Sequence, residues 1–253
     1  MARLAFILGF PRSGTTLLGQ VLASRGDVTL LEEKPLLNKS IADFVAEKDG
    51  PARLAALPDG VLEPYRADFL ARAQAQGIET EGRLIVDQTA FNTVYLSIIW
   101  RLFPGAPIVF ALRDPRDVVF SCFRRLFGPN QFTVEFHSLE STAALYDATM
   151  RYAEECRERI GFAPLDLRNE DLIADFDRET RRLCAHLGLD WSEALRDYHH
   201  ASETRTLSTR SATQVRQGVS NEGVGQWRRY RAQLEPVMPL LQPWVERFGY
   251  PAD

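Results

Sequence analysis

The residues best suited to binding an anion lie in a turn between an apolar run and a helical pattern. The run Leu4 to Leu8 leads directly into the turn, which reads Gly9-Phe10-Pro11-Arg12-Ser13-Gly14-Thr15-Thr16. A buried strand that turns at once into a helix presents backbone N–H groups and the positive end of the helix dipole at one point. Glycines let the backbone approach a ligand closely, and the hydroxyls and the guanidinium add donors. The turn therefore predicts an anion-binding loop.

A second polar group follows another apolar run, Pro107 to Leu112. It begins Arg113-Asp114-Pro115-Arg116-Asp117, and Ser121 stands eight residues after Arg113. An arginine at a strand end and a serine one or two turns into the next helix can face the same phosphate, which arginine binds with paired hydrogen bonds. In the alternative interpretation, Asp114 only caps the helix and Arg113 forms a surface ion pair.

Apolar runs alternate with helical patterns along the chain. Strands are predicted at residues 3–8, 27–31, 83–86, 107–112 and 165–167. Helices are predicted at 15–24, in pieces across 36–78, and at 93–103, 116–126, 138–160, 178–187 and 233–248, with a long polar loop at 202–222. This alternation predicts an α/β fold with a parallel sheet covered on both faces. Ligands bind such sheets beyond the carboxyl ends of the strands, where the polar clusters 9–16, 32–34, 87–89 and 113–117 fall.

Composition limits the class of protein. The chain has 253 residues, of which 45% are hydrophobic and 25% charged, and we expect a single domain over residues 1–253. A net charge of -4 argues against a general binder of nucleic acid or membranes. The scattered cysteines Cys122, Cys156 and Cys184 and the short N-terminal apolar run favour a cytoplasmic protein with free thiols. No Cys, His or carboxylate spacing predicts a metal site.

The first loop departs from the loop of nucleoside triphosphatases. Gly9 and Gly14 have the spacing of Gly-x-x-x-x-Gly-Lys-Ser/Thr, but Thr15 stands in place of the lysine that triphosphate chemistry requires. A small-molecule kinase or triphosphatase with a degenerate loop remains an alternative function.

The two motifs together resemble those of sulfotransferases that use 3'-phosphoadenosine 5'-phosphosulfate (PAPS). The resemblance is greatest to the branch that contains tyrosylprotein sulfotransferases and bacterial relatives. It implies a P-loop-type three-layer fold, with Pro11, Arg12, Ser13, Gly14, Thr15 and Thr16 on the 5'-phosphosulfate. It implies that Arg113 and Ser121 hold the 3'-phosphate, and that the product is adenosine 3',5'-bisphosphate, with no metal.

The same resemblance implies a catalytic base and a covering tail. Of the pair Glu32-Glu33, the second is the general base in that branch, so Glu33 and Arg12 are the catalytic candidates. Otherwise the pair is a solvated charge cluster at a helix start. In relatives the tail closes over the nucleotide, and the candidate contacts here are Ser211, Gln214, Val215, Arg216, Gln226 and Trp227.

The sequence departs from the family pattern at three positions. Gln88 stands where relatives carry a lysine that assists the leaving group, Asn169 replaces a tyrosine near the adenosine, and Gln226 replaces a cation. Arg12 is then the main cation, with Lys34 as a second candidate. A non-catalytic nucleotide-binding relative therefore remains a further alternative.

The acceptor is less well specified by the sequence. Residues 36–78 and 128–140 are the candidate acceptor wall, whose apolar members are Leu36, Leu37, Phe44, Tyr65, Phe69, Phe132 and Phe136, with Phe127 at its edge. They suggest an apolar or aromatic acceptor, a small molecule or a peptide, although such residues are also typical of a core. A homodimer is left open.

Overall fold

A parallel sheet forms the centre of the protein. The computed structural model describes residues 3–78, 82–128, 130–198 and 223–252. The strands are β1 (Arg3–Gly9), β2 (Val28–Glu32), β3 (Leu84–Gln88), β4 (Ile108–Leu112) and β5 (Leu165–Arg168). All their pairings are parallel, in the order β2-β3-β1-β4-β5. This arrangement confirms the predicted α/β class and each of the five predicted strands to within a few residues.

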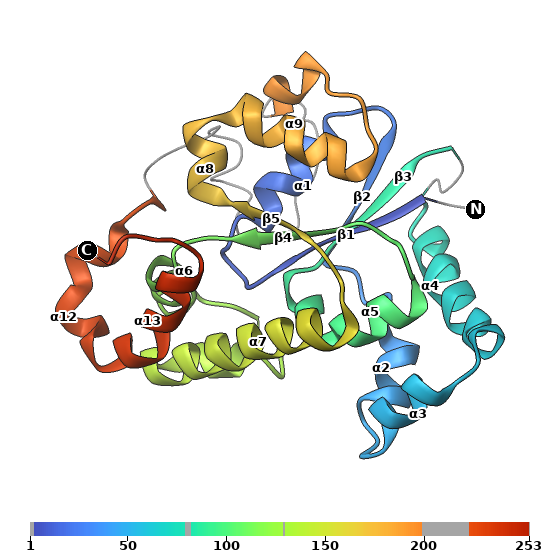
Figure 1. The fold of residues 1–253 in the computed structure, drawn as a ribbon, viewed down its shortest axis with the longest axis horizontal. Coiled ribbons are helices and arrows are strands. Elements are labelled where there is room, and N and C mark those ends of the chain that lie inside the picture. The colour runs from blue at the N-terminus through green and yellow to red at the C-terminus, as the bar shows by residue number, and fades with distance from the viewer. Residues whose placement is uncertain (1–2, 79–81, 129, 199–222, 253) are drawn as a thin grey trace.

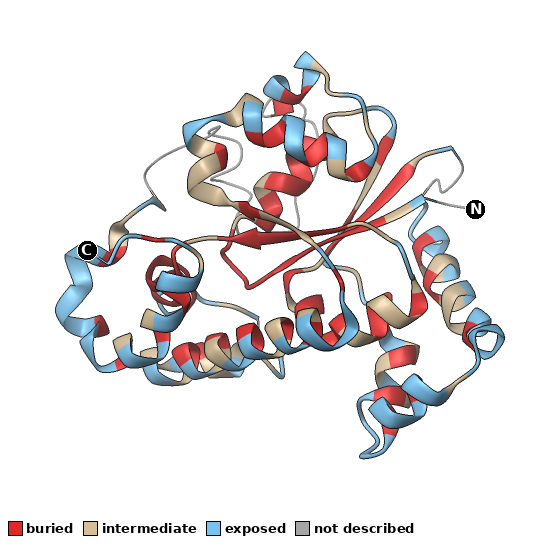
Figure 2. Cartoon of the chain, in the orientation of Figure 1, coloured by how far each residue is buried: buried red, intermediate tan, exposed pale blue. Residues whose placement is uncertain are grey.

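Helices cover both faces of the sheet (Figure 1). One face packs against α1 (Thr15–Ala23), α8 (Asn169–Ala174) and α9 (Phe176–Leu187). The other packs against α5 (Leu96–Leu102), α6 (Pro115–Phe123), α7 (Leu139–Ile160) and α13 (Met238–Arg247). Successive strand residues point to opposite faces, so Ile7 joins the first core and Phe6 the second. Figure 2 shows the resulting buried strands and half-buried helices, which form three layers.

The strand order creates a crevice beside β1. The chain leaves β1, builds β2 and then β3 on one side of it, and crosses to the other side for β4. Connections that diverge from neighbouring strands leave a crevice at their carboxyl ends, where ligands of such sheets bind. The loop after β1 and the segment after β4 both begin there.

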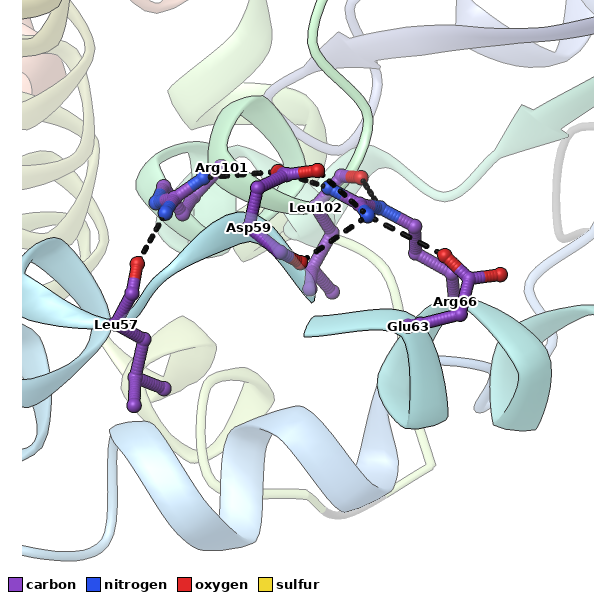
Figure 3. Close-up of polar contacts among 6 residues, drawn as sticks. All are labelled: Leu57, Asp59, Glu63, Arg66, Arg101 and Leu102. Carbon is purple, nitrogen blue, oxygen red and sulfur yellow. Dashed lines mark hydrogen bonds and ion pairs between the residues drawn. The ribbon is translucent and has the colours of Figure 1, made fainter. Parts of the chain in front are cut away.

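A helical excursion between β2 and β3 is attached to the second face. It comprises α2 (Asn38–Phe44), α3 (Gly50–Ala56), the 3₁₀ turn Asp59–Leu62 and α4 (Glu63–Ala75). Figure 3 shows how it is tied to α5: Arg66 of α4 donates to the Leu102 carbonyl at 2.5 Å and pairs with Asp59 at 2.6 Å. Arg101 of α5 pairs with the same Asp59 at 3.3 Å and donates to the Leu57 carbonyl. These contacts fix the excursion against the end of α5.

Two predicted helices are divided in the structure. Residues 93–103 begin within a 3₁₀ turn, Ala90–Tyr95, before α5, because the Thr93 hydroxyl lies 3.0 Å from the Ala90 carbonyl and also contacts β1. The last predicted helix divides into α12 (Arg231–Leu234), the 3₁₀ turn Glu235–Val237 and α13. Proline lacks the N–H that a helix interior needs, and Pro236 and Pro239 stand near the two starts.

The remaining 3₁₀ turns are Thr133–His137, Glu193–Asp197 and Gln226–Tyr230. The predicted loop 202–222 lies outside the described residues. No helix in the described part of the chain is long and apolar enough to cross a membrane.

Candidate functional site

The loop after β1 has the backbone of an anion site. Gly9 and Gly14 have φ of 152° and 100°, and a Cβ on either would lie 2.7 Å from a neighbouring oxygen, of Ala111 and Asn169 respectively. Only glycine fits both the conformation and the space. The Ser13 N–H donates to the Phe10 carbonyl at 3.1 Å, and α1 begins at Thr15, so the loop leads directly into the helix N-terminus.

A buried threonine that sequence reasoning missed fixes the start of this loop. The Gly9 N–H donates to Thr93 Oγ1 at 2.8 Å, and Thr93 Oγ1 lies 2.7 Å from the Gly9 carbonyl oxygen. Thr93 is fully buried. The sequence placed it only as the first residue of a helix, and nothing local indicates that it contacts β1, 84 residues earlier.

The two predicted anion motifs meet in the structure. Arg12 Nε donates to Ser121 Oγ at 3.1 Å, and Arg113 Nη1 donates to the Arg12 carbonyl at 3.1 Å. Burial first, and then the nearby guanidinium groups of Arg125, Arg113 and Arg124, lower the pKa of Arg12 to about 10. Cations held this close together favour an anionic ligand, because a bound anion relieves their mutual repulsion.

A cavity of about 730 Å³ opens beside the loop. Its charged lining residues are Arg12, Glu33 and Lys34, and the hydroxyls of Thr15 and Thr16 belong to the same lining. The volume is that of a small-molecule site. The predicted anion-binding loop and a carboxylate therefore border the same space, an arrangement that suits group transfer with proton removal.

The two glutamates after β2 have different surroundings. Glu32 accepts a hydrogen bond of 2.5 Å from Gln20 Nε2 of α1 and does not belong to the cavity lining. Glu33 is exposed, lines the cavity and has φ of 48°, while its N–H donates to the Gln88 carbonyl at 3.3 Å. Together with Arg12, at φ of 72°, it is one of the two non-glycine residues with positive φ in the described part of the chain.

The last two residues of β3, Asp87 and Gln88, point to opposite faces of the sheet. Gln88 is buried toward α1, where its Oε1 would lie 2.7 Å from a Cβ on Gly19, and it does not line the cavity. Asp87 is buried on the opposite face and accepts a hydrogen bond of 3.2 Å from Asn92 Nδ2. Burial raises the pKa of Asp87 to about 7. Asn92 lines the cavity, so it connects the buried carboxyl with the site.

The C-terminal segment reaches the site through α6. Asp117 accepts hydrogen bonds from the Gly225 N–H at 2.6 Å and the Trp227 N–H at 2.9 Å, and Arg113 Nη2 donates to the Gly223 carbonyl at 2.5 Å. The Trp227 ring is 1% exposed and lies under the Arg116 guanidinium, 3.7 Å from the ring centroid. Its side chain therefore packs within the protein. Gln226 follows the Gly225 turn, and Ser211, Gln214, Val215 and Arg216 lie outside the described residues.

The candidate acceptor wall is only partly as expected. Leu36, Leu37, Phe127 and Phe132 line the cavity. The other aromatic candidates pack elsewhere in the core, and they are Phe44, Tyr65, Phe69 and Phe136. Phe91 and Tyr95 also line the cavity but lie outside both predicted segments, and Ile41 lies within the first segment but was not named. Hydrophobic type alone does not separate cavity walls from the core, because both are apolar.

Among the described residues, no group of three or more His, Cys, Asp or Glu side chains could hold a metal ion. Cys122, Cys156 and Cys184 are buried and free. His137 is exposed and its Nδ1 lies 2.8 Å from the Val134 carbonyl, whereas His186 contacts the Ile108 carbonyl through Nε2 at 3.0 Å.

Known proteins resemble the chain over nearly its whole length. It is 27% identical to an uncharacterised protein of Aquifex aeolicus over 97% of this chain but only 33% of that protein. It is 24% identical to protein-tyrosine sulfotransferase 1 of Danio rerio, over 98% of this chain and 72% of that protein. The chain thus spans about a third of the first relative and about seven-tenths of the second.

Solved structures share the fold. The sulfotransferase domain of the olefin synthase of Synechococcus superposes with a TM-score of 0.67 at 21% identity, over 99% of this chain and 96% of that domain. A mouse sulfotransferase complexed with PAP superposes with a TM-score of 0.56 at 16% identity, over 96% of this chain and 84% of that chain. A sequence model described as "Sulfotransferase family" matches residues 5–193. The chain belongs to the sulfotransferase family.

Proposed function

We propose that this protein transfers a sulfuryl group from PAPS to a hydroxyl or amine of an acceptor, with Glu33 as the general base. One observation carries the proposal: Arg12 and Glu33, which have left-handed backbones, both line the cavity that contains the loop threonines. Such backbone costs about 1–3 kcal/mol and persists where the surrounding structure fixes it, which is common at functional sites.

The side of the cavity that is formed by the loop after β1 suits the donor. The donor supplies the sulfuryl group and leaves as adenosine 3',5'-bisphosphate (PAP), the ligand named for the mouse structural relative. Arg113 and Ser121 would bind the 3'-phosphate, because both contact Arg12 at the crevice beside β1. The loop N–H groups, Arg12, Thr15 and Thr16 would stabilise the charge that grows on the bridging and sulfonate oxygens.

The side of the cavity that contains Glu33 suits the acceptor. Glu33 would accept the proton of the acceptor hydroxyl as its oxygen attacks sulfur and the bond from sulfur to the bridging oxygen breaks. Arg12 would face the developing negative charge, since Gln88, in the place of the expected lysine, is turned toward α1. The atoms balance: the proton goes to Glu33 and the electron pair to the bisphosphate.

The test is the variant Glu33→Gln, which keeps the shape of the side chain and removes its basicity. We expect transfer to fall by about 10²–10⁴-fold, the usual contribution of a general base. Binding of adenosine 3',5'-bisphosphate, measured by calorimetry, should stay unchanged. Glu32→Gln is the matched control, because Glu32 bonds Gln20 and does not line the cavity. Full turnover by Glu33→Gln would refute the assignment.

A thermal-shift comparison separates the proposal from a nucleoside triphosphatase. Adenosine 3',5'-bisphosphate should raise the melting temperature more than ATP with Mg²⁺, because the second phosphate meets Arg113 and Thr15 replaces the lysine that binds triphosphates. Stabilisation by ATP with Mg²⁺ alone would favour the triphosphatase instead.

A further inference from the structure

The cavity is lined by charged residues that have different roles in the proposed function. Its lining contains Arg12, Glu33 and Lys34 and no other charged residue among those the structure describes. In the proposed function, Arg12 faces the donor and Glu33 takes the acceptor proton. The donor side also has the guanidinium groups of Arg113, Arg124 and Arg125, close enough to lower the pKa of Arg12. Lys34 is therefore the cation left for the acceptor.

Lys34 is available for that purpose. Within the described chain, its ammonium takes part in no hydrogen bond or ion pair, and its side chain is half-buried in the cavity lining. Most arginines around the fold are paired, such as Arg66 with Asp59 at 2.6 Å (Figure 3). A half-buried cation without a counter-ion favours a ligand that brings a negative charge.

The cavity also has an aromatic wall. Phe91 and Phe132 are stacked with ring centroids 4.8 Å apart, and Tyr95 meets Phe132 edge-on at 6.3 Å. The Tyr95 hydroxyl accepts a hydrogen bond of 2.9 Å from Gln131 Nε2. Aromatic side chains that keep offset or edge-on contacts with one another offer the same contacts to a flat ring of a ligand.

We propose that the acceptor is a small aromatic alcohol that carries an anionic group, with its ring against Phe91 and Phe132 and its anion on Lys34. This inference rests on the proposed function and specifies the acceptor for that site. Lys34 then determines specificity: it binds the far end of the acceptor while Glu33, the preceding residue, faces the hydroxyl. A cavity of about 730 Å³ accommodates a molecule of this size.

The test compares three phenols of similar shape and different charge. They are 3-(4-hydroxyphenyl)propionate, which is anionic, 4-propylphenol, which is neutral, and tyramine, which is cationic. We expect the highest kcat/KM for the anion. Lys34→Met should lower kcat/KM for the anion by about 2- to 5-fold, the scale of a partly exposed ion pair, and should leave kcat/KM for 4-propylphenol unchanged. Lys34→Glu should reverse the order of the anion and tyramine.

Lys39→Met is the matched control for loss of a lysine. Lys39 lies over the Tyr65 ring, 5.1 Å from its centroid, and does not belong to the cavity lining. The Lys39→Met variant should show the same order of kcat/KM for the three phenols as the unaltered protein. An equal loss with all three phenols in Lys34→Met would assign Lys34 to the leaving group and overturn the proposal.

Two results distinguish failure of this inference from failure of the proposed function. Turnover of an aliphatic alcohol or of N-acetylglucosamine, with no turnover of any phenol, would overturn the aromatic acceptor and leave sulfuryl transfer intact. Absence of both bisphosphate binding and bisphosphate release from PAPS with every acceptor would refute the proposed function itself.

Discussion

At the scale of single residues, the site combines strained backbone with concentrated charge. Arg12 and Glu33 hold φ of 72° and 48°, a region that costs a residue with a side chain about 1–3 kcal/mol. Arg12 is also 8% exposed beside other guanidinium groups, and its pKa is lowered. Arg12 and Glu33 both line the cavity. Binding of an anion there would offset part of the electrostatic cost of keeping Arg12 buried beside other cations.

Arg113 belongs to the same scale, because its proposed role is contact with one phosphate. Arg113→Ala should weaken binding of adenosine 3',5'-bisphosphate by about 1.5–3 kcal/mol, the value of a hydrogen bond to a charged group. Calorimetry with that ligand and with adenosine 5'-phosphate measures the difference. An equal loss for both ligands would mean that Arg113 acts only by holding Arg12, whose carbonyl it contacts at 3.1 Å.

At the scale of elements, β3 and the following 3₁₀ turn Ala90–Tyr95 form a support for the loop. Thr93 holds Gly9, where β1 ends, and Asn92 joins Asp87 of β3 to the cavity. Sequence separation hides this connection, because β1 and the turn meet only through the parallel sheet. The position of the loop therefore depends on this turn, although the sequence predicted only the start of a helix there.

Removal of the Thr93 hydroxyl tests the support. Thr93→Val keeps the shape of the side chain but leaves the Gly9 N–H without a partner, and we expect unfolding to require about 1–3 kcal/mol less free energy. Urea denaturation measures this difference. Thr93→Ser keeps the hydroxyl and should recover most of the loss, and equal instability of both variants would point to packing instead.

Asp87 should make stability depend on pH. Its pKa is about 7 in the folded protein, against an ordinary 3.8, so between these values the folded state holds a proton that the unfolded state has lost. The free energy of unfolding therefore falls as pH rises from about 4 to about 7. In Asp87→Asn this contribution, on the order of 4 kcal/mol, should be absent. Urea denaturation of both proteins across that pH range measures their free energies of unfolding. If these changed equally with pH in the unaltered protein and in Asp87→Asn, the assignment to Asp87 would be wrong.

At the scale of the whole molecule, α6 joins the site to the end of the chain. Arg116 is fully buried, pairs with Asp114 at 2.8 Å, and donates to the carbonyls of Pro251 at 2.7 Å and Ala252 at 2.9 Å. With Trp227 beneath it, this arginine holds the C-terminal segment against the helix that carries Ser121. The C-terminal segment thus supports the helix that borders the predicted anion site.

Loss of Arg116 should destabilise the protein strongly. Arg116→Met leaves Asp114 as a buried carboxylate without its cation, and we expect a loss of about 3–5 kcal/mol in urea denaturation. Adding Asp114→Asn removes the uncompensated charge and keeps an acceptor for the helix cap, so the double variant should be more stable than Arg116→Met. A double variant that is less stable would show that the lost packing on Trp227 dominates.

The sequence by itself determined the strands and the loop after β1, and it predicted a phosphate site shared by Arg113 and Ser121, each of which contacts Arg12 in the structure. Each of these depends on local patterns: an apolar run, a tight turn, and a spacing of one or two helical turns. The tertiary structure alone decided that Glu33 and not Glu32 lines the cavity, that Gln88 turns toward α1, and which aromatic residues form the wall. The reason is physical: the face that a side chain meets depends on strand register, on backbone φ and on partners far along the chain.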